Sequence, residues 1–228
     1  KPTNAWPGIG AALPDWLRDF TSKLMDEAGG NFIRWGHSAG SPAEIAMGDK
    51  YGFVTLMPGV CGESDNTGEA WDIRIKAFRD TVVYYRNHPS IFIWEGGNWA
   101  ISAEHFEQVT DIINTYDPHG RRLLGNRRAE VKAHAGKYVT IEVGTEGWER
   151  KFPELPIVES EYFRDESPRR VWDNDSPPSY GDYPRKQMNQ YKWTSEEFAV
   201  LQADHWWNKM GRKPYHSGGA NWIFSDGP

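Results

Sequence analysis

Two glutamates at the end of an apolar run are the first residues that could do chemistry. The run Pro156–Glu161 predicts a strand, in which alternate side chains share a face, so Glu159 and Glu161 point the same way. A buried glutamate without a partner costs several kcal/mol. An ion pair between Glu159 and an inward arginine such as Arg34 is one explanation. Glu161, at the strand end, is favoured as a carboxylate that acts on a substrate.

Two further strand candidates end in polar side chains. Arg34 lies within Asn31–Trp35 and His37 follows it, while Ile91–Glu95 is followed by Gly96-Gly97-Asn98-Trp99. The C-terminal ends of strands in a parallel barrel face one site. These side chains are therefore expected to gather around Glu161.

Tryptophan is unusually frequent, with 12 in 228 residues. An indole face can hold a sugar ring, because pyranose C–H groups form an apolar patch that packs on a flat π-face. Many of these residues must be core, but a few should line a ligand site. The tryptophans at strand ends are the candidates: Trp35, Trp94, Trp99 and Trp222.

The elements that must position these residues alternate along the chain. Helices are predicted by apolar stripes after Pro14-Asp15 (Leu17, Phe20, Leu24), over Ile75–Tyr85 and after Ser102 (Phe106, Val109, Ile113), and by a capping box at Thr194–Glu197. The strand candidates are Asn31–Trp35, Phe53–Met57, Ile91–Glu95, Arg122–Gly125, Val139–Val143, Pro156–Glu161 and Ala220–Phe224.

This alternation predicts an α/β fold with a parallel sheet and right-handed crossovers. Seven strands fit a (β/α)8 TIM barrel whose first strand lies upstream of Lys1. A doubly wound nucleotide-binding fold is the alternative, but its glycine-rich phosphate motifs are absent from the sequence. The irregular segment Arg164–Gln190 follows a strand end, where active-site loops of barrels lie.

Composition excludes several classes. The net charge of −6 and the lack of a basic tail argue against a nucleic-acid partner. No apolar run approaches the ~20 residues that span a bilayer. The single cysteine, Cys61, excludes an internal disulfide framework. The histidines lack zinc-site spacing, so neither a metal nor a cofactor is expected.

Several motifs resemble the catalytic barrel of glycoside hydrolase family 2, which includes β-galactosidases, β-glucuronidases and β-mannosidases. The most specific is R-N-H-P-S-I before a strand and W-x-x-G-N, here Arg86–Ile91 and Trp94–Asn98. The other matches are N-x-x-R-x-x-H (Asn31, Arg34, His37), D-x-x-G (Asp49, Gly52), S-E-Y (Ser160–Tyr162) and W-x-F-x-D (Trp222–Asp226).

The resemblance implies retaining hydrolysis that removes a terminal sugar from an oligo- or polysaccharide, with Glu161 as nucleophile. The chain departs from the family where the acid/base glutamate follows G-N, because Trp99 stands there and cannot donate a proton to a leaving group. Glu95, where the motif has a small residue, is the predicted displaced acid. Its alternative is a buried ion pair with Arg34 or His37. The substrate-binding candidates are Arg34, His37, Asn98, Trp99 and Trp222.

A barrel that binds carbohydrate without cleaving it is the alternative function. We further expect residues 1–228 to form one barrel domain cut from a larger polypeptide with flanking β-sandwich domains. The resemblance favours a periplasmic or extracellular location, which the sequence itself does not fix.

Overall fold

The computed structural model describes residues 12–59, 64–127, 138–142, 157–162, 199–200, 203–210 and 216–221. Its helices are α1 (Asp15–Glu27), α2 (Pro42–Tyr51), α3 (Glu69–Tyr85), α4 (Ala103–Tyr116) and the π-helix η6 (His205–Met210). Its strands are β1 (Phe32–Arg34), β2 (Val54–Pro58), β3 (Ile91–Glu95), β4 (Leu123–Arg127), β5 (Tyr138–Glu142), β6 (Ile157–Tyr162) and β7 (His216–Asn221).

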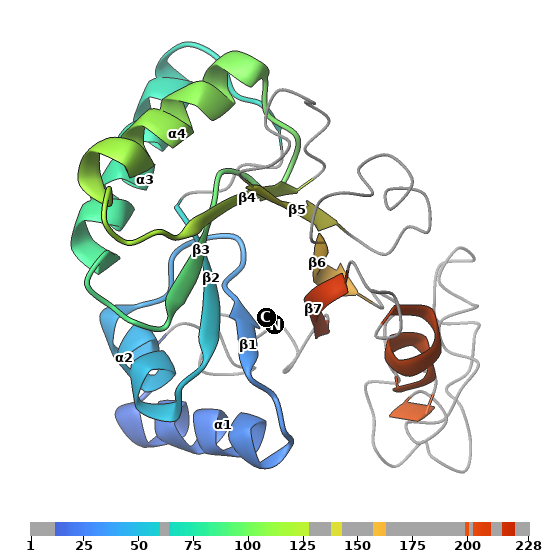
Figure 1. Cartoon of the computed structure of the whole chain (residues 1–228). Helices are drawn as coiled ribbons and strands as arrows, with labels where there is room; N and C mark the ends of the chain where they lie inside the picture. Colours follow the sequence, from blue (N-terminus) through green and yellow to red (C-terminus); the bar gives the residue numbers. More distant parts are fainter. Residues whose placement is uncertain are drawn as a thin grey trace, which may run out of the picture.

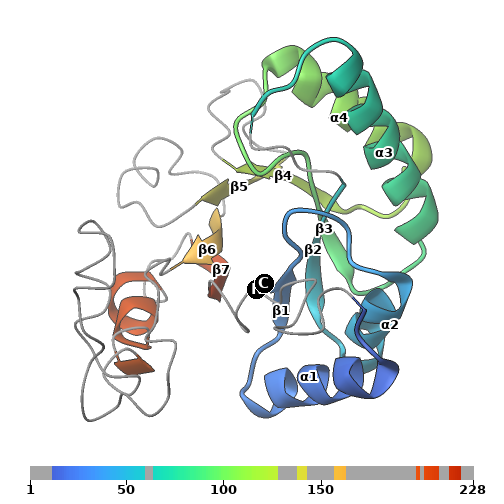
Figure 2. The same ribbon diagram turned by 180° about the vertical axis from the view of Figure 1, so that it is seen from behind.

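The seven strands form one parallel sheet in the order of the chain, from β1 to β7. The sheet curves so that β1 and β7 lie in contact, and α1 to α4 cover its outer face (Figure 1). Figure 2 shows the same curvature from behind. The α/β fold with a parallel sheet is therefore confirmed.

The predicted strands agree closely with the observed ones except at the end of the chain. The prediction Ile91–Glu95 matches β3, whereas β7 covers His216–Asn221 instead of Ala220–Phe224. Glycines at 218 and 219 give β7 a weak intrinsic strand preference. The bounds of β7 are determined instead by its backbone pairing with β6, in which the register shifts twice. Trp222, the Thr194–Glu197 capping box and the Arg164–Gln190 segment lie outside the described residues.

Two apolar clusters lie on opposite faces of the sheet. The larger one packs α2, α3 and α4 against the strands and includes Phe78, Val82, Phe106, Val109 and Ile113. These are residues of the predicted helix stripes. The smaller cluster consists of Leu56, Ile93 and Val158, from β2, β3 and β6. Because β3 and β6 are not neighbours in the sheet, this contact shows that the inner face closes around its own side chains.

The helix predicted after Pro14-Asp15 is confirmed as α1, but only part of its apolar stripe is buried. Leu17 is buried, but Phe20 and Leu24 are exposed. The reason is tertiary: α1 packs on α2, and Asp19 accepts hydrogen bonds from Lys50 and from the Tyr51 hydroxyl at the end of α2. That contact rotates α1 so that one side of it faces solvent.

The motif residues Asp49 and His88 have a structural role at the start of β3. The Asp49 carboxylate lies 2.6 Å from His88 Nδ1 and accepts a 3.0 Å hydrogen bond from the Ser90 backbone N–H. The pair fixes where α2 ends and β3 begins, at the end of the sheet opposite to the polar strand ends.

Among the described residues, no helix combines the length and the apolar character needed to cross a membrane.

Candidate active site

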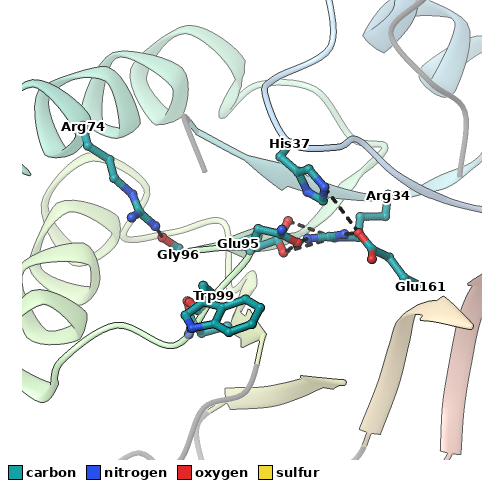
Figure 3. A network of polar contacts seen from close by, with 9 residues as sticks. Arg34, His37, Arg74, Glu95, Gly96, Trp99 and Glu161 are labelled. Carbon is teal, nitrogen blue, oxygen red and sulfur yellow. Dashed lines mark hydrogen bonds and ion pairs between the residues drawn. The ribbon is translucent and has the colours of Figure 1, made fainter. Parts of the chain in front are cut away.

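Arg34, the last residue of β1, lies at the centre of a buried polar network on the inner face of the sheet (Figure 3). Its Nε donates to both carboxylate oxygens of Glu95, at 3.0 and 3.1 Å, and its Nη2 also donates to Glu95 Oε1. Its Nη1 donates to Glu161 Oε1 at 2.5 Å. One guanidinium therefore links β1 to β3 and β6, which are far apart in the sequence.

The register explains why these residues meet. Arg34 pairs with Leu56 on β2, and Pro58 at the end of β2 pairs with Glu95 at the end of β3. Arg34 and Glu95 therefore both lie near the C-terminal ends of their strands. Glu161 reaches the same level from β6, where the pairing with β7 shifts register between Glu159 and Tyr162. The predicted gathering of strand-end residues is confirmed for this trio.

Asn98 and His37 complete the network. Asn98 is buried and its Oδ1 accepts a 2.8 Å hydrogen bond from Arg34 Nη2. His37 is partly exposed, and its Nε2 lies 3.6 Å from Glu161 Oε1. Both residues were predicted at the site, and both lie there. Figure 3 shows the Arg34 guanidinium between Glu95 and Glu161, with His37 above it.

Within this trio, a single guanidinium faces two carboxyl groups. Their side chains are closed from solvent, with 0% exposure for Arg34 and Glu95 and 1% for Glu161. An arginine in contact favours the ionised form of a carboxyl group, while a second carboxylate nearby opposes it. Glu95 has the greater share of the guanidinium, since it takes contacts from two nitrogens.

These contacts mean different things for the two predicted catalytic roles. A nucleophilic carboxylate must be ionised, which the Arg34 contact to Glu161 favours. A general acid must carry a proton, which the Arg34 contacts to Glu95 oppose. Glu95 thus lies at the site, and it forms there the buried ion pair with Arg34 that was the alternative to an acid role. Its role as the displaced acid stays a prediction.

Trp99 lies beside this network on the segment that follows β3, with its side chain 38% exposed. Its backbone carbonyl accepts a 3.3 Å hydrogen bond from Asn126 Nδ2 of β4. The Gly96 carbonyl accepts from Arg74 Nη2 of α3 at 3.0 Å. Sequence reasoning missed Arg74 and Asn126, although Asn126 at a strand end was a visible signal.

Gly97 is required here for space rather than for a special backbone angle. A Cβ atom at this position would lie 2.5 Å from Arg74 Nη2 and 3.0 Å from the Trp99 carbonyl oxygen. Gly97 does not have a positive φ angle. Gly97 lets Arg74 approach the backbone that carries Asn98 and Trp99.

Trp35 and Trp94 do not face the site, which corrects the prediction for these two residues. Both are buried in the cluster between the sheet and the helices, and Trp94 Nε1 donates to Asp117 Oδ2 at 2.9 Å. Each follows or precedes a site residue, Arg34 or Glu95, on its strand. Neighbouring side chains in a strand point to opposite faces. Trp222 lies outside the described residues.

A second polar cluster joins the segment after β2 to the start of α4. Asp65 lies 2.6 Å from His105 Nδ1 and accepts a 2.9 Å hydrogen bond from the Ser102 N–H. Burial alone would raise the pKa of Asp65, but the hydrogen bonds from His105 and Ser102 outweigh it and lower the pKa below its ordinary value. His105 also stacks on Trp71, with 3.7 Å between ring centroids. This cluster supports the segment that carries Asn98 and Trp99.

A metal centre is not indicated in the part of the chain that the structure describes. No group of three or more histidine, cysteine, aspartate or glutamate side chains there could hold an ion. The described structure is thus an α/β domain with a carboxylate–arginine site at the C-terminal ends of parallel strands.

Known proteins show which family carries this arrangement. A β-glucuronidase from Formosa agariphila is 71% identical over 229 residues, covering all of this chain and 23% of the relative. A solved structure of a β-glucuronidase from glycoside hydrolase family 2 has 66% identity and a TM-score of 0.88, covering 100% of this chain and 24% of that one. β-Glucuronidase 3 of Bacteroides uniformis, at 19% identity and a TM-score of 0.71, shares the fold.

These likenesses place the chain in glycoside hydrolase family 2, as the sequence motifs predicted. No protein-family model matches the sequence. The chain spans about a quarter of the length of the relatives that match it from end to end.

Proposed function

We propose that this chain is the catalytic domain of a retaining glycoside hydrolase that removes a terminal β-linked hexuronic acid. Membership of glycoside hydrolase family 2 supports hydrolysis with retention. The β-glucuronidases among its relatives support a uronic acid as the sugar. The observation that carries the assignment is the 2.5 Å contact of Arg34 Nη1 with Glu161 Oε1, which orients an ionised carboxylate at the strand ends.

Glu161 acts as the nucleophile in this proposal. One carboxylate oxygen forms a bond to the anomeric carbon, the glycosidic C–O bond breaks, and its electron pair stays on the leaving-group oxygen, which takes up a proton. Water then attacks the glycosyl ester, giving the sugar with its original anomeric configuration and freeing Glu161. Arg34 holds the carboxylate in place. His37 and Asn98 lie beside it as the groups that meet sugar hydroxyls, and the exposed ring of Trp99 supplies a platform for a sugar.

The proton donor lies outside position 99, since an indole cannot supply it. Sequence reasoning predicts Glu95 for this role. Glu95 can take it only if it gives up its contacts with Arg34 and binds a proton instead. Leaving groups of low basicity need no acid assistance, so aryl glycosides test the nucleophile apart from the acid.

The binding-only barrel is the weaker alternative, because 71% identity to a β-glucuronidase favours hydrolysis. The test uses 4-nitrophenyl β-D-glucuronide. Glu161→Gln should lower kcat/KM by at least about a thousandfold, as expected when a nucleophile is removed. Glu104→Gln, an exposed α4 residue with the same change of charge, is the matched control and should keep normal activity. Retention is checked by proton NMR of the first anomer released. Wild-type turnover that survives Glu161→Gln would refute the assignment.

The (β/α)8 barrel is the architecture that we propose for this domain. Its support is the strictly sequential order of seven parallel strands and the contact between β1 and β7. An eighth strand between those two would complete the barrel.

The domain is proposed to belong to a longer polypeptide with flanking β-sandwich domains. Matched relatives are about four times as long as this chain. The side of α1 that faces solvent is a second support, because Trp16, Phe20 and Leu24 form an apolar stripe on it, with Trp16 68% exposed. Large apolar side chains gathered on one helix face support a covering domain, because such residues are more often buried.

A further inference from the structure

Glu95 has an environment that the proposed reaction does not yet explain. It is fully buried, it ends β3, and it takes two nitrogens of the Arg34 guanidinium, Nε and Nη2. An ordinary surface ion pair contributes little to stability and needs no fixed geometry. A buried pair is different, because a charge left alone there is strongly unfavourable. Glu95 and Arg34 therefore constrain each other.

The direction of the contacts shows what that constraint does. Guanidinium is a planar fork whose nitrogens point in fixed directions. With Nε and Nη2 held by Glu95, and Nη2 also bonded to Asn98 Oδ1, the remaining nitrogen Nη1 is aimed at Glu161. Glu95 does not need to touch a substrate to influence the nucleophile, since it fixes the plane of the group that touches Glu161.

Charge gives Glu95 a second effect on Glu161. A guanidinium shared by two carboxylates stabilises each of them less than it would stabilise one alone. Arg34 therefore stabilises the negative charge of Glu161 less than it would without Glu95. A carboxylate whose charge is stabilised too strongly would be a weaker nucleophile. The same contacts favour the ionised state of Glu95, the wrong state for a proton donor.

We propose that Glu95 is a positioning residue for Glu161, which acts through Arg34 by fixing the guanidinium plane and sharing its charge, and that it is not the displaced acid. This inference rests on the proposed function. Glu95, which the sequence alone predicts to transfer a proton, has a positioning role instead.

The experiment compares Glu95→Gln with the wild type on two substrates. They are 4-nitrophenyl β-D-glucuronide, with a good leaving group, and methyl β-D-glucuronide, with a poor one. The acid limb of kcat/KM reports ionisation of the nucleophile in the free enzyme. Removing the charge of Glu95 takes away the carboxylate that shares the Arg34 guanidinium with Glu161, so the acid limb should move to lower pH by about one unit. The rates of both substrates should fall by the same factor. Glu104→Gln should leave the limb where it is.

Two results would overturn the proposal. One is an acid limb that does not move. The other is a selective loss of the methyl glucuronide rate by Glu95→Gln, which would make Glu95 the acid. Glu95→Asp is the second variant, in case Glu95→Gln folds poorly. It keeps the charge but pulls the guanidinium back, so it should lower kcat for both substrates and leave the acid limb in place. An acid limb that shifts with Glu95→Asp also contradicts the proposal.

A readout without turnover separates this proposal from the proposed function. Carbon-13 NMR of glutamate side chains follows each carboxyl through its titration, and Glu161→Gln identifies the resonance of Glu161. The titration midpoint of Glu161 should fall by about one pH unit in Glu95→Gln. That shift in a chain that cleaves no glucuronide would refute the function and keep the positioning role. If the midpoint of Glu161 did not move in an enzyme that cleaves the glucuronide, the positioning role would be refuted and the proposed function would stand.

Discussion

Replacing Arg34 with methionine tests how the two buried carboxylates are held. Methionine fills the unbranched stem of the arginine and removes the guanidinium, which contacts Glu95 and Glu161 in the wild type. Removing one partner of a buried ion pair costs about 3–5 kcal/mol, because the other charge remains without compensation. Here two carboxylates lose the same partner.

The chain can avoid burying bare carboxylates by binding protons, and this sets the size of the effect. A glutamate in the unfolded chain has a pKa of about 4.3, and each pH unit above it costs about 1.36 kcal/mol to keep the group protonated. For each carboxyl that must take up a proton, Arg34→Met should lose about 4 kcal/mol at pH 7 and about 1 kcal/mol at pH 5. Since natural domains have about 5–15 kcal/mol of stability, the loss at pH 7 is a large fraction of the total.

The sign follows from linkage. In the variant, burial without the Arg34 guanidinium raises the pKa of the carboxyls above the unfolded value, so the folded state binds more protons than the unfolded state. Its stability is then fully present below about pH 4 and falls as pH rises towards neutrality. Urea titrations at pH 5 and pH 7, followed by circular dichroism, measure the difference from wild type at each pH.

Arg34→Lys is the matched control, since it keeps a positive charge and loses the fork. It should cost less than Arg34→Met at pH 7 and depend less on pH. A destabilisation by Arg34→Met that is the same at both pH values would refute the reasoning, because the carboxylates would then not depend on Arg34 for their ionised state. Recovery of the fold at pH 5 after its loss at pH 7 would support it.

Two further predictions concern the segments that support the site. Gly97→Ala should cost about 1–3 kcal/mol in urea unfolding and raise KM for the aryl glucuronide, since its Cβ would meet Arg74 Nη2 at 2.5 Å, whereas Gly96→Ala, with its nearest contact at 3.3 Å, should be milder. Equal costs for the two would contradict the steric argument. Asp65→Asn should cost about 1 kcal/mol at pH 6. Because hydrogen bonds from His105 and Ser102 outweigh burial and hold the pKa of Asp65 below its ordinary value, this contribution is present above about pH 4 and lost as pH falls through the folded pKa. The stability difference between wild type and Asp65→Asn, measured from pH 6 to pH 3, should therefore shrink, and a constant difference would count against it.

Local patterns were enough to predict most strands and the helices α1, α3 and α4. The run Ile91–Glu95 is β-branched and aromatic, and it matches β3 residue for residue. Ser102 was expected to cap α4, and its side chain accepts a hydrogen bond from the His105 N–H. The start of α2 has an equally local signal, a capping box in which Ser41 and Glu44 bond reciprocally, but the prediction did not use it.

What the sequence could not supply is the rotation and pairing set by distant segments. The exposed stripe of α1 has the same spacing as a buried one, and the packing of α1 on α2, which includes the contacts of Asp19 with Lys50 and Tyr51, decides which side faces inward. Likewise, Arg34, Glu95 and Glu161 were each predicted at the site. That one guanidinium joins all three depends on the register of β1, β2 and β3 and on the closure of the sheet towards β6.

The alternation of side chains along a strand accounts for both the success and the error at the site. Arg34 and Trp35 are neighbours in sequence, as are Glu95 and Trp94, so one member of each pair must leave the inner face. Placing all four at the site was therefore inconsistent with the strand geometry used to place Glu161. Once Arg34 bonds Glu95 across the inner face, Trp35 and Trp94 are forced into the core under the helices, where Trp94 finds Asp117. Trp99 escapes this constraint because it lies beyond the end of β3, separated from the strand by Gly96, Gly97 and Asn98. The site is thus built from charged residues inside the strands and an aromatic ring outside them, which is why its chemistry must be sought in Arg34, Glu95 and Glu161 rather than in the abundance of tryptophan.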